Sequence, residues 1–121
     1  MDAHFDPAEK LYRAVYPAPM FWKSNSKVSS AAFLSRRGGC SVDRGNYRDD
    51  EDVILDMRSR NFKGSIITVN VQDCLDISAL PVYAPSRTNI YHSEIHRDNE
   101  HEQLTAGQRK HLANSAVVVS D

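Results

Sequence analysis

Alternating apolar and polar positions predict several short β-strands along the chain, each bounded by Gly, Pro, Asn or Ser. In the first of them Leu11, Arg13 and Val15 share one face, because side chains alternate across a strand. The expected strands cover residues 11–16, 40–44, 65–71, 90–96 and 116–119. Residues 28–34 form either a further strand or a helical turn.

Two segments carry helix signals instead. Residues 49–60 begin with four consecutive acids, which suit the positive end of the helix dipole. Thr105 and Gln108 fit a capping box that starts a second helix. The stretch 73–89 is irregular, with one helical turn expected near residues 76–80.

The resulting order, β-β-β-α-β-loop-β-α-β, is typical of an α+β fold. We expect a single domain over residues 1–121, with a mostly antiparallel or mixed sheet of about five to six short strands. Two helices should pack on that sheet. The chain has 40% hydrophobic and 26% charged residues, which suits one modest core.

Charge and composition limit the partners and the compartment. The formal net charge is −1, so no general attraction to nucleic acid or to an anionic membrane is indicated. No apolar run reaches the roughly 18 residues that span a bilayer, and the N-terminus has no apolar signal core. We therefore predict a cytoplasmic protein without membrane contact. For Cys40 and Cys74, two free buried thiols are favoured, and a disulfide stays open.

The strand at 90–96 carries the clearest candidate chemistry. His92, Glu94 and His96 project from one face, where they can move protons or orient a substrate hydroxyl. All three cannot easily share one metal ion, because the outer pair lies about 13 Å apart on an extended strand. No metal site is therefore predicted. The competing interpretation is a solvated sheet face, with Tyr91 and Ile95 packed inward and the three titratable groups in water.

Arg13, Ser29 and Ser30 are weaker candidates. Arg13 is charged within an otherwise apolar strand, so it lies at an edge, extends to water, or binds an anion. The two serines precede Ala31 and form either a cap or the polar start of a strand. Neither serine stands in a nucleophile-elbow sequence.

Arg13 on the first strand, Ser29-Ser30 before an aromatic residue, and Glu94 on a late strand together resemble the order of functional residues in ADP-ribosyltransferase-like domains of the small bacterial toxin type. The resemblance covers about a dozen positions, and the chain lacks the usual Ser-Thr-Ser. It implies NAD as the bound nucleotide. Arg13 would contact its phosphate or ribose, Ser29 or Ser30 would support the nicotinamide side, and Glu94 would hold a ribose hydroxyl.

Three functional hypotheses follow. The first is a small accessory or interaction domain of a prokaryotic or phage system, acting through a protein partner or as a homo-oligomer. The second is a small enzyme on NAD, a nucleotide or RNA, using Glu94 with His92 or His96. The third is RNA binding through Phe21, Trp22 and a group of basic residues between positions 23 and 44, namely Lys23, Lys27, Arg36, Arg37 and Arg44.

Overall fold

The computed structural model describes residues 1–36 and 38–121, and most of its strands belong to one antiparallel sheet. The order of the six strands across this sheet is β6 (Leu80–Tyr83), β7 (His92–His96), β4 (Cys40–Arg44), β1 (Lys10–Val15), β5 (Ser65–Asn70) and β8 (Val117–Ser120). A separate hairpin pairs β2 (Trp22–Ser24) with β3 (Lys27–Val28). The predicted α+β class and the strand count of the main sheet are confirmed.

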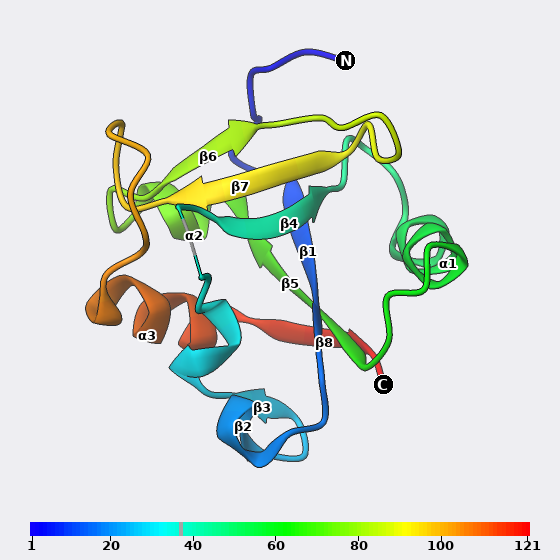
Figure 1. Ribbon diagram of the computed structural model, residues 1–121, viewed down its shortest axis with the longest axis vertical. Helices are drawn as coiled ribbons and strands as arrows, with labels where there is room; N and C mark the ends of the chain where they lie inside the picture. The colour runs from blue at the N-terminus through cyan, green and yellow to red at the C-terminus, as the bar shows by residue number, and fades with distance from the viewer. Residues whose placement is uncertain (37) are drawn as a thin grey trace.

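The sheet divides into two halves at the junction of β1 and β4. On one side β1 pairs with β5 over six residues, from Lys10 to Val15. On the other side it pairs with β4 over only two, Leu11 and Tyr12, before the strands part. Figure 1 shows the result: β4, β7 and β6 run across the view, whereas β1 and β5 run down it.

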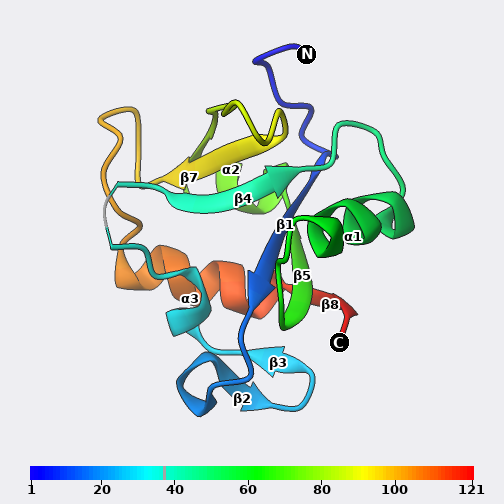
Figure 2. The ribbon, with the colours of Figure 1, turned by 45° about the vertical axis from the view of Figure 1, so that its right-hand side comes forward.

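Helices cover both faces of the half that contains β1 and β5 (Figure 2). α1 (Asp50–Ser59) packs Val53 and Met57 against Tyr12 and Ile66. The opposite face carries the larger core, which α3 (Ala106–Ser115), α2 (Val71–Leu75) and a short 3-10 turn (Ser30–Phe33) cover. A second 3-10 turn (Pro19–Phe21) precedes β2.

The local signals for α1 and α3 are confirmed. Acids fill the first turn of α1, and Arg58 lies in its last turn. The Thr105 hydroxyl accepts a hydrogen bond from the Gln108 backbone N–H at 3.1 Å, and the Gln108 side chain accepts one from the Thr105 N–H at 3.0 Å. These bonds satisfy backbone donors that the first turn of a helix leaves free.

Both expected helices are present, and the short α2 is an additional one that was not predicted. The strand predicted through Val71 ends at Asn70, where the Asp73 carboxylate accepts a hydrogen bond from the Asn70 N–H at 2.8 Å. This bond starts α2 directly after β5. The turn expected near residues 76–80 is present at residues 76–78, directly after α2, and β6 begins at Leu80.

Both cysteines, Cys40 and Cys74, are free and buried, as the sequence favoured. Among the described residues, none of the helices is long and apolar enough to span a membrane.

Candidate functional site

Arg13 occupies the gap where β1 and β4 part. Its Nη1 donates to the Ser41 carbonyl oxygen of β4 at 2.6 Å. Its Nε and Nη2 donate to the Ala32 and Leu34 carbonyl oxygens, at 2.7 and 3.0 Å. These three bonds take the place of the missing pairing between β1 and β4, and they fix the guanidinium in the gap.

The positive charge of Arg13 stays without a counter-charge. All three acceptors are neutral carbonyls, and among the described residues Arg13 forms no ion pair. A guanidinium carries five N–H donors, so two are left after these three bonds. An arginine held in this way is suited to bind an anion.

Two open hollows meet at Arg13. The larger measures about 590 Å³, and its lining includes Arg13, Tyr16, Met20, Phe21, Leu34 and Arg36. The smaller measures about 160 Å³ and includes Arg13, Tyr16, Ser41, Asp43, Phe62 and His92. The larger volume lies within the range of small-molecule sites.

Glu94 lies next to this gap, on the far side of β4. Glu94 on β7 is paired with Ser41 on β4, whose carbonyl oxygen binds Arg13. Its carboxylate Oε1 lies 3.1 Å from His96 Nε2. A Cβ added at Gly39 would approach the Glu94 Cβ to 2.8 Å and the His96 Cε1 to 2.7 Å. The absence of a side chain at Gly39 therefore lets both groups pack closely against β4.

The charges of Arg13 and Glu94 act on the same thiol. Burial raises the pKa of Cys40, the Arg13 charge lowers it, and the Glu94 charge raises it further. The two predicted residues thus lie within electrostatic reach of one point on β4. The buried thiol itself is unsuited to act as a nucleophile, because burial disfavours the thiolate.

The competing interpretation, a solvated face at His92, Glu94 and His96, is wrong for His96. Only 5% of His96 is exposed, and its ring stacks on the ring of His101, with 4.7 Å between centroids. His92 is half-buried, and its Nδ1 lies 2.8 Å from the Ala84 carbonyl oxygen. No group of three or more His, Cys, Asp or Glu within residues 1–36 and 38–121 is placed to hold a metal ion.

Ser29 and Ser30 do not join Arg13 and Glu94. The Ser29 hydroxyl donates to the Met20 carbonyl oxygen at 2.5 Å, and so connects the two 3-10 turns. Ser30 is the first residue of the second turn. Neither serine lines the two hollows that meet at Arg13.

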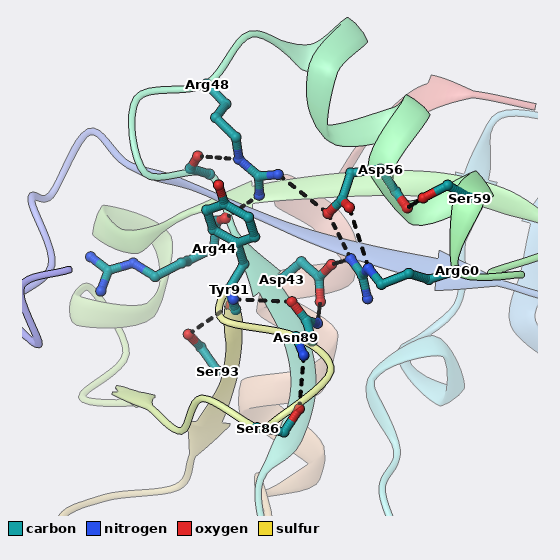
Figure 3. A network of polar contacts seen from close by, with 11 residues as sticks. Asp43, Arg44, Arg48, Asp56, Ser59, Arg60, Ser86, Asn89, Tyr91 and Ser93 are labelled. Atoms are coloured by element: carbon teal, nitrogen blue, oxygen red, sulfur yellow. Dashed lines mark hydrogen bonds and ion pairs between the residues drawn. The ribbon is translucent and has the colours of Figure 1, made fainter.

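Sequence reasoning missed a polar network beside the smaller hollow (Figure 3). The buried Asp43 carboxylate of β4 accepts hydrogen bonds from Arg60 and from the Asn89 amide. Arg60 also pairs with Asp56 on α1 at 2.9 Å. The Arg48 guanidinium pairs with Asp56 as well and lies 3.4 Å from the centre of the Tyr91 ring.

This network joins α1 and the loop before β7 to β4, and so supports one wall of the smaller hollow. The alternation that predicts a strand over residues 40–44 does not indicate which side chains contact Asp43. Its partners Arg60 and Asn89 lie 17 and 46 residues further along the chain.

The basic residues between positions 23 and 44 do not form one exposed group. Arg44 is buried against Glu9, and Lys27 donates to the Asn114 carbonyl oxygen. Trp22 and Phe21 pack against the core. Arg37 lies outside the described residues.

Comparisons with protein-family models, with curated proteins and with solved structures gave no significant match to this chain.

Proposed function

We propose that the chain is a small enzyme of the ADP-ribosyltransferase-like kind, which binds NAD or a related nucleotide in the hollows around Arg13. The observation that carries this proposal is the fixed, uncompensated guanidinium of Arg13, one strand away from the Glu94 carboxylate. A fixed cation that lines an open hollow suits the phosphate of a nucleotide, and a carboxylate one strand away suits a sugar hydroxyl of the same ligand.

Each residue has a defined part in this proposal. The two remaining N–H groups of Arg13 bind the pyrophosphate. Tyr16, Met20 and Phe21 provide the apolar wall for a flat ring. Glu94 accepts a hydroxyl of the nicotinamide ribose and stabilises the positive charge that develops on that sugar. The glycosidic C–N bond breaks, its electron pair leaves with nicotinamide, and an acceptor such as water bonds to the sugar carbon and gives up a proton.

Glu94→Gln tests the catalytic part. The amide keeps an oxygen toward His96 but removes the negative charge, so nicotinamide release from NAD should fall by about 100-fold or more. The assay is chromatographic detection of nicotinamide after incubation with NAD. The midpoint of thermal unfolding should change little, because the Glu94 side chain is one-third exposed.

The matched control is Glu51→Gln, which makes the same chemical change on an exposed position of α1. It should release nicotinamide like the wild type. Equal rates for all three proteins, or no binding of NAD to the wild type by calorimetry, would contradict the proposed enzyme.

We also propose a second function, as an accessory or interaction domain that contacts a protein partner or a second copy. An exposed apolar rim favours it: Tyr16 and Met20 are each 60% exposed beside the larger hollow, next to the exposed Leu34. Exposed apolar groups gathered at one place are typical of contact surfaces.

Met20→Lys tests this second function by placing a charge in the rim. Sedimentation velocity should show the wild type in a complex with a second copy or with the protein partner, and this complex should be lost in the variant. Leu55→Lys is the control, because Leu55 is an exposed apolar residue of α1 that lines neither hollow. A complex that survives Met20→Lys, or that Leu55→Lys disrupts equally, counts against a contact through the rim.

A further inference from the structure

His96 is buried in a way that the reaction outlined above does not require. Within residues 1–36 and 38–121, only its Nε2 has a partner, the Glu94 carboxylate at 3.1 Å. Its Nδ1 is buried and, among the described residues, has no hydrogen-bond partner. A buried polar atom without a partner is costly, so the position of this ring needs an explanation.

The partners of the ring determine where its proton lies. A proton on Nδ1 would leave a buried donor unsatisfied and would direct the Nε2 lone pair at the Glu94 carboxylate. A proton on Nε2 gives a hydrogen bond to Glu94 and leaves only an acceptor unsatisfied. The contacts therefore favour the Nε2–H form of His96.

The ring is also prevented from turning away. The backbone of Gly39 is so close that an added Cβ would lie 2.7 Å from the His96 Cε1 and 2.9 Å from its Nδ1. The His101 ring also stacks on the His96 ring, with 24° between the two planes. His101 has a φ of 61°, an uncommon conformation for a non-glycine residue, so the loop maintains the stack at some local cost.

We propose that His96 is a positioning residue: its Nε2–H holds one oxygen of Glu94 and turns the other toward the sugar hydroxyl of the ligand. This role rests on the proposed enzyme function. The Glu94 carboxylate is one-third exposed, so a fixed donor restricts its rotation, and orientation contributes strongly to catalysis.

The bond can be tested without any ligand. In protein labelled with ¹⁵N-histidine, long-range ¹H–¹⁵N spectra at neutral pH should show His96 protonated at Nε2, with the signal assigned by its loss in His96→Leu. In Glu94→Ala this preference should weaken. A wild-type His96 protonated at Nδ1, or unaffected by Glu94→Ala, overturns the proposal.

The consequence for catalysis is tested with NAD as the probe. His96→Leu should lower kcat for nicotinamide release at least 10-fold and leave KM within about twofold, because Glu94 is present but not oriented. His96→Gln should recover most of the rate, since its amide N–H can replace Nε2–H. His111→Leu, which removes a histidine of α3, should leave kcat unchanged.

Equal losses in the Leu and Gln variants, with thermal unfolding unchanged, would overturn the positioning role. If the wild type neither binds nor cleaves NAD, the proposed enzyme fails, whereas the spectra of the free protein still decide whether His96 holds Glu94.

Discussion

Arg44 and Arg13 lie on neighbouring strands, and their surroundings differ in charge and in burial. Arg44, opposite Leu11 in the sheet, forms a two-point pair with the Glu9 carboxylate, with both bonds at 2.8 Å. Both side chains are 2% exposed. The Phe5 ring covers the guanidinium at 4.1 Å, and the Asp2 and His4 carbonyl oxygens accept further hydrogen bonds.

Arg13, two residues beyond Leu11, is fixed equally well but by neutral groups alone. It lines two open hollows rather than a closed core. Its charge is therefore available to a ligand, whereas the charge of Arg44 is already neutralised.

This difference separates a structural arginine from a binding one. A buried charge must be paired, and Arg44 uses the whole carboxylate of Glu9 for this purpose. An anion site needs the opposite, a cation fixed in advance and without a protein counter-charge. By this criterion Arg13 is the binding candidate of the two.

The largest loss of stability should come from breaking the buried ion pair between Glu9 and Arg44. Glu9→Gln leaves the buried Arg44 without a counter-charge, and we expect the free energy of unfolding to fall by about 3–5 kcal/mol. Urea denaturation measures it. The double variant Glu9→Leu with Arg44→Met should recover much of the loss, because no charge stays buried. A loss below about 1 kcal/mol in Glu9→Gln would show that the pair is not the structural element described above.

A smaller loss of stability is expected at the open site. Arg13→Met removes three hydrogen bonds, but water can reach the Ser41 and Leu34 carbonyl oxygens, so we expect a loss of about 1–2 kcal/mol. NAD affinity measured by calorimetry should fall at least 10-fold. The comparison of the two arginines fails if Arg13→Met destabilises as much as Glu9→Gln, or if the folded variant binds NAD like the wild type.

Much of the fold could be predicted because its signals are local. Alternation of apolar residues predicted β1, β4, β5 and β7 within two residues at each end. The helix α2 was missed because Val71 continues the β-branched run of β5. Residues 116–119 are all apolar, yet β8 lies at the edge of the sheet with Val117 58% exposed. Position within a sheet depends on pairing, which alternation does not report.

The site was only partly predictable for the same reason. Arg13 and Glu94 stood out as charges within strands, but their proximity depends on the early parting of β1 and β4. One interpretation placed His96 in water, because the sequence does not reveal that Gly39 lies beside it. Ser29 followed from residue order alone, and its hydroxyl instead connects two backbone turns.

The smallest loss of stability is expected at Asp56. Its carboxylate is paired but partly exposed, so its surroundings are intermediate between those of Arg44 and Arg13. Asp56 shares Arg60 with Asp43, and its side chain is 34% exposed. The hydrogen bond from Arg60 lowers the pKa of Asp56. Its contribution to stability is therefore present above the unfolded-state pKa of about 4 and is lost as the pH falls through the lower folded-state value.

Asp56→Asn should lower the free energy of unfolding by less than about 1 kcal/mol at neutral pH. Solvent screens the pair between Asp56 and Arg60, and Arg60 still has Asp43 as a partner. The substitution should also remove part of the acid-side decline in stability, as followed by urea denaturation from neutral pH to below pH 4. A cost close to that of Glu9→Gln would mean that burial does not set the strength of these pairs. The contrast between Arg44 and Arg13 would then lose its physical basis.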